Sequence, residues 1–136
     1  MRAEANHVTS TMRATTLESG QARVFTVEHL MAALYTLGVD NCIVEISSAE
    51  APVGDGSALP FVRLIEQAGI VTLSKPRNVL IVDEVVEVTD KDRFIRIEPY
   101  DGLKISFTSY NAHPLLGLQV AEYEITPEVF VREIAP

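Results

Sequence analysis

The sequence predicts an α+β fold in two parts, and three observations lead to this prediction. Apolar residues recur at helical spacing over residues 27–37 and again over residues 58–68, and each run is followed by a glycine. From about residue 74 the pattern changes to short runs in which β-branched or aromatic residues nearly alternate with charged ones. Such alternation is typical of half-exposed antiparallel strands. The change divides the chain into residues 1–73 and residues 74–136.

The first part is expected to begin in extended conformation and then to form a helix. Residues 7–17 are rich in Thr and Val, and the turn signal of residues 19–21 follows them. Thr26 is the predicted N-cap of the helix, because its hydroxyl can accept a hydrogen bond from an amide of the first turn. Gly38 is the predicted C′ residue at the other end.

A strand and a second helix are expected to complete this part. Residues 39–46 are β-branched and follow a turn, so they predict a buried strand, and Cys42 is interpreted as a small buried residue within it. Ser57 is the predicted cap of a helix over residues 58–68, which ends at Gly69.

The second part is predicted to be an antiparallel meander that leads into a helix. The predicted strands cover residues 78–88, 93–99 and 103–110, with a further strand near residues 118–125. Thr126, Pro127 and Glu128 supply a cap, a first-turn proline and an acid that open the last helix.

Composition limits the class of protein. The 136 residues include 11 Lys and Arg against 19 Asp and Glu, a formal charge of −8, which argues against a nucleic-acid or anionic-membrane partner. The sequence contains neither a long apolar stretch nor a signal sequence, so we expect no stable membrane insertion and a cytoplasmic location. A single cysteine excludes an internal disulfide framework.

Glu28 and His29 place two titratable groups at the start of an otherwise apolar helix. Neutral imidazole is a good zinc ligand, and a nearby carboxylate that does not bind the metal can take a proton from the water that zinc activates. The helix N-terminus favours an ionised Glu28, as a general base requires. The ordinary alternative is an acid that complements the helix dipole beside a partly buried histidine. The dipeptide alone favours this alternative, because a zinc site needs three protein ligands.

No second ligand is evident from spacing. His7 lies in a polar stretch and His113 in a loop before a proline, and neither forms an HxxxH or HxxxD pair with His29. The chain contains no GxGxxG, P-loop or GxSxG motif, so nucleotide-fold and serine-hydrolase interpretations have no support. Ser57 has no base placed beside it by the sequence, and a helix cap is the simpler interpretation.

Several motifs in order resemble one family of enzymes. They are TVEHLMAAL (26–34), GVDNCIVEI (38–46), APVGDGSALPFVRLIEQAGI (51–70), EPYDG (98–102), HPLLG (113–117) and ITPEVFVREIAP (125–136). Together they resemble the UDP-3-O-acyl-N-acetylglucosamine deacetylases, zinc amidases of lipid A biosynthesis, over nearly the whole chain. The resemblance implies two-layer sheet-and-helix domains, with both domains incomplete in this sequence.

The resemblance also implies roles for particular residues. Glu28 matches the family's general base and His29 one of its Zn²⁺ ligands. Arg93 stands where members often carry a lysine near the nucleotide, and Tyr110 is the candidate for the aromatic residue that stacks on uracil, although it is out of step with the family pattern. The implied partner is a UDP-sugar that carries an acyl chain.

The sequence also departs from the family pattern. The other two zinc ligands, a histidine and an aspartate of an HxxxD helix, have no match, nor has a later histidine that acts as an acid. The chain is therefore expected to be an internal fragment that is inactive alone and binds zinc weakly. A non-catalytic scaffold or truncated paralogue is the alternative, and the DNA that follows the codon of Pro136 would separate the two.

Overall fold

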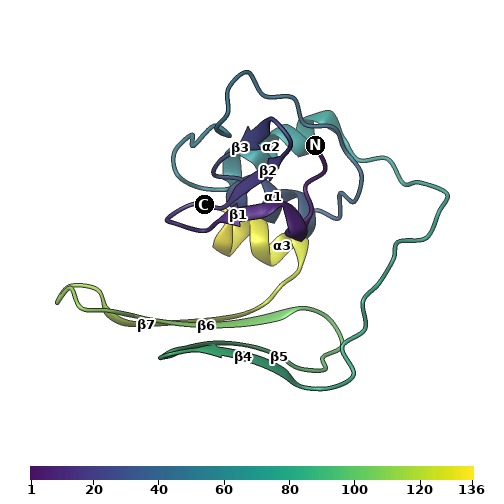
Figure 1. Cartoon of the computed structure of the whole chain (residues 1–136). Coiled ribbons are helices and arrows are strands. Elements are labelled where there is room, and N and C mark those ends of the chain that lie inside the picture. Colours follow the sequence, from purple (N-terminus) through teal and green to yellow (C-terminus); the bar gives the residue numbers. More distant parts are fainter. The chain divides into compact units, whose positions relative to one another are not determined.

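The computed structural model describes all residues, 1–136, and the chain forms two compact units (Figure 1). The first unit comprises Met1–Thr72 together with Phe130–Pro136, and the second comprises Leu73–Val129. Helices and small antiparallel sheets are both present, so the predicted α+β class is confirmed. The assignment of residues 1–73 and 74–136 to two deacetylase domains stays a prediction.

A three-stranded antiparallel sheet opens the first unit. A short 3-10 helix, η1 (Ala5–His7), precedes β1 (Val8–Ser10), β2 (Thr16–Ser19) and β3 (Ala22–Val24), which pair in the order β1-β2-β3. The turn between β2 and β3 contains Gly20 at φ +60°, a conformation that glycine adopts without a steric penalty. Thr16 and Leu17 of the central strand are buried, so β2 is the firmly held strand of this sheet.

Helix α1 (Glu28–Thr36) does not begin as predicted. Its N-cap is Val27, without a side-chain cap, and Thr26 lies at φ +58° with its hydroxyl donating to Glu50 Oε1 at 2.8 Å. The backbone of Phe25 pairs with Ala49 and Ala51 through hydrogen bonds of 2.8 and 3.1 Å, which brings Glu50 beside Thr26. The prediction of Thr26 as a cap was wrong, because the pairing of Phe25 with residues 49–51 holds Thr26 at a positive φ, one residue before the N-cap, instead of in the extended conformation that a capping residue adopts.

The end of α1 confirms the predicted role of Gly38. This residue has φ +74°, and its amide donates to Tyr35 O at 3.1 Å. The Val39 amide donates to Leu34 O at 2.9 Å. The two bonds form a Schellman motif, which satisfies carbonyl groups at the helix end.

Residues 39–46 were wrongly predicted to be a buried strand. They form no strand and are mostly exposed, with Ile43 at 92% exposure and Cys42 exposed as a free thiol. A strand requires a neighbouring strand for its amides and carbonyls, and no strand of this chain pairs with the segment. The residue types indicated strand propensity, but propensity alone does not supply a partner.

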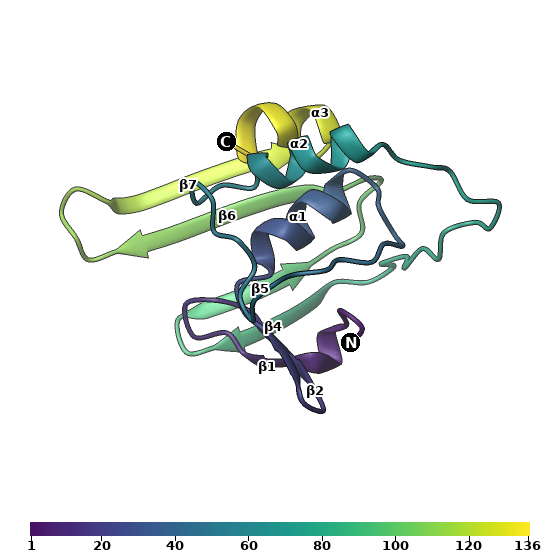
Figure 2. The ribbon, with the colours of Figure 1, turned by 90° about the horizontal axis from the view of Figure 1, so that it is seen from above.

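Helix α2 (Leu59–Ala68) ends at Gly69, as predicted, and forms the core with α1 (Figure 2). The Ser57 hydroxyl accepts a hydrogen bond from the Leu59 amide at 3.2 Å, which confirms its capping contact, although the N-cap residue is Ala58. The buried core joins both helices to the C-terminal segment and consists of Ala33, Ala58, Phe61, Val62, Phe130 and Ala135.

The second unit consists of two separate hairpins. Strand β4 (Val86–Asp90) pairs with β5 (Arg93–Ile97), and β6 (Lys104–Asn111) pairs with β7 (Gly117–Glu124). No ladder joins β5 to β6, so the predicted continuous meander was wrong, and residues 78–85 are not a strand. Most hairpin residues are exposed, so no buried core fixes a wider sheet.

The last helical segment begins as the sequence predicted. The Val129 amide donates to Thr126 Oγ1 at 3.2 Å at the start of α3 (Pro127–Val129), and a π-helix, η2 (Phe130–Ile134), continues it. The Ala135 carbonyl accepts a hydrogen bond of 2.9 Å from the Leu59 amide, which ties the end of the chain to the start of α2. No helix has the length and apolar character needed to cross a membrane.

Candidate functional site

A hollow of about 270 Å³ lies in the first unit at the start of α1. Three segments form its wall: the first turns of α1, the loop before α2 and the C-terminal segment. The lining residues are Glu28, His29, Ala32, Gly56, Ser57, Ala58, Phe130, Ile134 and Pro136. The wall is therefore mainly apolar, with a carboxylate, an imidazole and a hydroxyl on it.

Glu28 is the first residue of α1, and the residue immediately before β2 holds its side chain. The Thr15 amide donates to Glu28 Oε2 at 3.0 Å, across 13 positions of the sequence. The free amides of the first helical turn carry partial positive charge, so the Glu28 side chain lies at the positive end of the helix dipole. Glu28 also lines a second, apolar hollow of about 270 Å³ together with Thr15, Leu17, Val27 and Met31.

His29 reaches the same hollow from the next position of α1. Its ring makes no hydrogen bond and no ion pair, so both ring nitrogens are available to a ligand. His7 and His113 differ in this respect. His7 Nδ1 lies 2.8 Å from Arg2 O, and His113 Nδ1 accepts a hydrogen bond from the Leu115 amide at 3.3 Å.

The side chains on the hollow of the first unit could provide one of the ligands of a zinc site. An unengaged imidazole beside a carboxylate is the combination that catalytic zinc sites use. No group of three or more His, Cys, Asp or Glu side chains that could hold a metal ion exists in the structure. His29 therefore fits a single ligand position, and the chain does not assemble a full ligand set.

The loop before α2 is held by one aspartate. Asp55 Oδ1 accepts hydrogen bonds from the Ser57 amide at 3.0 Å and from the Ser57 hydroxyl at 2.8 Å. These bonds hold the pKa of Asp55 below its ordinary value, with the hydroxyl as the larger cause. Ser57 thus has its donor engaged and keeps a fixed position on the wall of the hollow.

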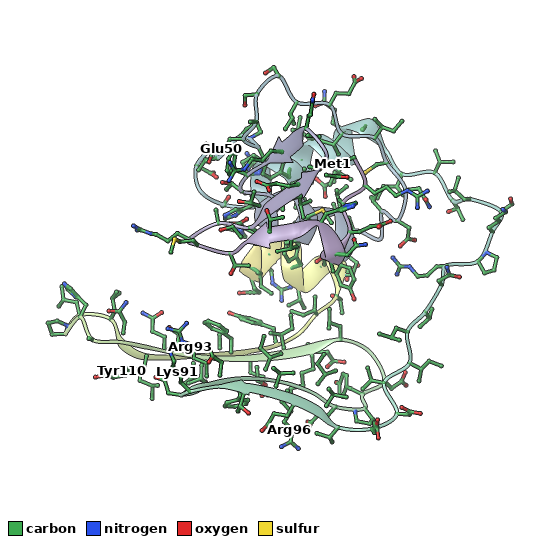
Figure 3. All side chains as sticks on the ribbon, in the orientation of Figure 1. Met1, Glu50, Lys91, Arg93, Arg96 and Tyr110 are labelled. Carbon is green, nitrogen blue, oxygen red and sulfur yellow. The ribbon has the colours of Figure 1, made fainter.

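The two predicted substrate residues lie in the second unit (Figure 3). Arg93 opens β5 opposite Asp90, and Tyr110 lies near the end of β6 opposite Leu118. Both side chains are exposed, that of Tyr110 at 79%. The structure thus brings Glu28 and His29 together, whereas Arg93 and Tyr110 occupy separate hairpins.

Sequence reasoning missed the partner of Glu28 and part of the hollow that His29 lines. Thr15 was assigned only to an extended segment, and nothing in the local pattern links it to Glu28. Ser57 was interpreted only as a cap. The contributions of Phe130, Ile134 and Pro136 come from the far end of the sequence, and the apolar spacing of that segment was the only available signal.

Comparison with known proteins gives consistent matches. The family model described as UDP-3-O-acyl N-acetylglycosamine deacetylase matches residues 1–136. A protein of Anaeromyxobacter dehalogenans named UDP-3-O-acyl-N-acetylglucosamine deacetylase is 44% identical over 133 residues, which cover 98% of this chain and 43% of that protein. Proteins of the same name from Thioalkalivibrio sulfidiphilus and Xanthomonas euvesicatoria are 43% and 47% identical, over 99% and 98% of this chain. The chain spans less than half the length of these three relatives.

Proposed function

Because the chain belongs to the UDP-3-O-acyl N-acetylglycosamine deacetylase family, we propose that it carries part of the active site of such an enzyme. The reaction is hydrolysis of the acetamide of UDP-3-O-acyl-N-acetylglucosamine in lipid A biosynthesis. The observation that carries the proposal is the hollow on which Glu28 and the unengaged ring of His29 lie together.

Glu28 is the general base of the proposed reaction, and His29 holds Zn²⁺. Zinc, when bound, supplies polarisation of the amide carbonyl and makes water a stronger acid. Glu28 takes the proton from the attacking water, whose oxygen forms a bond to the acetamide carbon. The C–N bond then breaks as the departing nitrogen takes a proton, which the acid histidine of the family would supply from outside this chain, and acetate and the free glucosamine amine are released. An amide is a poor electrophile, so the reaction needs both polarisation of the carbonyl group and removal of a proton from the attacking water.

Arg93 and Tyr110 are proposed to contact the nucleotide part of the substrate. A guanidinium group suits the diphosphate, and an exposed phenol ring suits stacking on the uracil base. Tyr110 is exposed and therefore accessible to a base. Both roles come from the family resemblance.

The 136-residue chain alone is proposed to be inactive and to bind zinc weakly. One imidazole cannot hold the ion with the three protein ligands that catalytic zinc sites use. No residue of the chain matches the family's acid histidine, which leaves the departing amine without a proton donor.

A chimera tests the proposal. Residues 1–136 of this chain replace the matching segment of the Thioalkalivibrio sulfidiphilus relative, and release of acetate from UDP-3-O-acyl-N-acetylglucosamine is measured with and without zinc. We expect zinc-dependent turnover by the chimera and none by the isolated chain. A correctly folded, zinc-loaded chimera without turnover would contradict the proposal. Turnover by the isolated chain would contradict the predicted inactivity of that chain.

A non-catalytic role is the second candidate. The absence of a metal-binding group of three side chains and the extensive exposed apolar surface both favour a fragment that only packs against other polypeptide. This alternative predicts that the chimera has no turnover, whereas the enzymatic proposal predicts turnover that Glu28→Gln removes.

A further inference from the structure

Thr26 turns the chain sharply just before α1. Its φ is +58°, and it is the only β-branched residue at positive φ, since the other non-glycine residues there are Arg13 and Lys91. A glycine adopts this conformation freely, whereas a branched Cβ makes it strained. Strained residues persist only where their surroundings hold them, and they are common at functional sites. What holds Thr26 is therefore informative.

The backbone on both sides of Thr26 is fixed. Phe25 pairs with residues 49–51 through hydrogen bonds of 2.8 and 3.1 Å. Val27 has 7% exposure, and its carbonyl accepts a hydrogen bond of 2.9 Å from the Met31 amide. The change of direction between the paired segment and the helix therefore falls on Thr26.

Glu50 is a well-placed partner for the Thr26 hydroxyl, which donates to Glu50 Oε1 at 2.8 Å (Figure 3). The Ser48 hydroxyl accepts a hydrogen bond from the Glu50 amide at 3.3 Å and donates to the Glu50 carbonyl at 2.9 Å. The next residue, Ala51, has 2% exposure. The backbone that presents the Glu50 carboxylate is thus held on both sides, and it leads into the loop of residues 56–58 on the wall of the hollow.

We propose that Thr26 and Glu50 are a pair of positioning residues, whose contact holds the start of α1 in the direction that places Glu28 and His29 on the hollow. The inference rests on the proposed function, which assigns the chemistry to these two side chains. Neither Thr26 nor Glu50 lines the hollow, so both act through the start of the helix. A glycine would make the same turn without strain, but it could not make the contact with Glu50.

The test separates the hydroxyl of Thr26 from the shape of its side chain. Thr26→Val keeps the branched shape and removes the hydroxyl, Thr26→Ser keeps the hydroxyl, and Glu50→Ala removes the acceptor. Glu45→Ala is the matched control, because it removes another exposed glutamate of the segment between α1 and α2. NMR relaxation dispersion of the amides in the first turn of α1 is measured in the metal-free 136-residue chain, and kcat and KM are measured in the chimera.

We expect motion of the first turn in Thr26→Val and in Glu50→Ala, but not in the wild type, Thr26→Ser or Glu45→Ala. In the chimera, the first two substitutions should each lower kcat by about 10²-fold with KM unchanged, as a displacement of about 1 Å at a reacting group does. The double variant should lose no more than either single variant, because the two side chains make one contact.

Three results would overturn the inference while the wild-type chimera remains active. They are a first turn that is equally rigid in all the variants, a loss of kcat in Thr26→Ser as large as that in Thr26→Val, and additive losses in the double variant. If Thr26→Val does not fold, Glu50→Ala decides the outcome alone, because Glu50 is exposed. A folded, zinc-loaded wild-type chimera without turnover would contradict the proposed function, and the inference would fall with it.

Discussion

Asp55 shows at the residue scale how local hydrogen bonds hold the wall of the hollow. Its carboxylate accepts two bonds from Ser57, and these keep the pKa of Asp55 below its ordinary value. A lowered folded-state pKa means that the stabilising contribution is present above the ordinary pKa and is lost as the pH falls through the lowered value. The carboxyl group is fully exposed, so this contribution is modest.

Ser57→Ala should raise the pKa of Asp55 towards its ordinary value, because it removes the hydroxyl bond that is the main cause of the shift. The measurement is an NMR titration of the Asp55 carboxyl carbon in the variant and the wild type. Ser48→Ala is the control, since the hydroxyl of Ser48 hydrogen-bonds to the backbone of Glu50 and not to Asp55. An unchanged titration of Asp55 in Ser57→Ala would show that the hydroxyl does not stabilise the carboxylate.

The hydrogen bonds of individual residues could be predicted from the sequence where both partners lie within a few positions of each other. The capping contacts of Ser57 and Thr126 involve amides two or three positions away, and both were predicted. The contacts of Thr26 and Thr15 were not predicted, because the partners are distant in the sequence. Thr26 contacts Glu50, 24 positions away, and Thr15 contacts Glu28, 13 positions away. The local sequence pattern does not indicate which distant side chain or backbone group will supply an acceptor or a donor.

Gly38 illustrates the element scale, because the Schellman motif at the end of α1 requires its positive φ. A Cβ at this position would have no atom within 4 Å, so the cost of a side chain is conformational rather than steric. Gly38→Ala should lower the free energy of unfolding by about 1 kcal/mol. Urea unfolding measures the change. Gly38→Asn should lose less, since asparagine tolerates this region, and an equal loss in both variants would contradict the explanation.

Val62 is the fully buried side chain of α2 and tests the packing of the helices in the core. Val62→Ala should cost about 2 kcal/mol of unfolding free energy, because two buried methyl groups are lost and a cavity is left. Val71→Ala removes the same atoms at 81% exposure and should change little. Similar urea midpoints for the two variants would show that the helices are not packed in solution as described.

The elements differ in how far sequence could predict them. Helices α1 and α2 were predicted because their hydrogen bonds are internal and their boundaries carry glycines. Residues 39–46 and 78–85 have strand composition without a strand partner, and they are not strands. The position of the hollow required the tertiary fold, because it joins residues from both ends of the first unit.

Large apolar side chains are exposed along the whole molecule. The two hairpins of the second unit contribute Ile95 at 73% and Phe107 at 62% exposure. Exposed apolar patches of this kind drive association.

The isolated chain should therefore associate as its concentration rises. Light scattering should report a mass above 14.9 kDa at high concentration, and Phe107→Glu together with Ile95→Lys should lower it. A monomer at all concentrations, without binding of a hydrophobic dye, would show that the apolar faces are covered in solution.

The central claim is that Glu28 and His29 perform different tasks at one site. The most direct measurement compares zinc content and turnover of the chimera with Glu28→Gln and with His29→Gln. We predict that Glu28→Gln retains zinc and loses turnover by about 10²- to 10⁴-fold, as expected for removal of a general base, whereas His29→Gln loses the zinc itself. Full turnover in the Glu28→Gln chimera, or an undiminished zinc content in His29→Gln, would contradict the account.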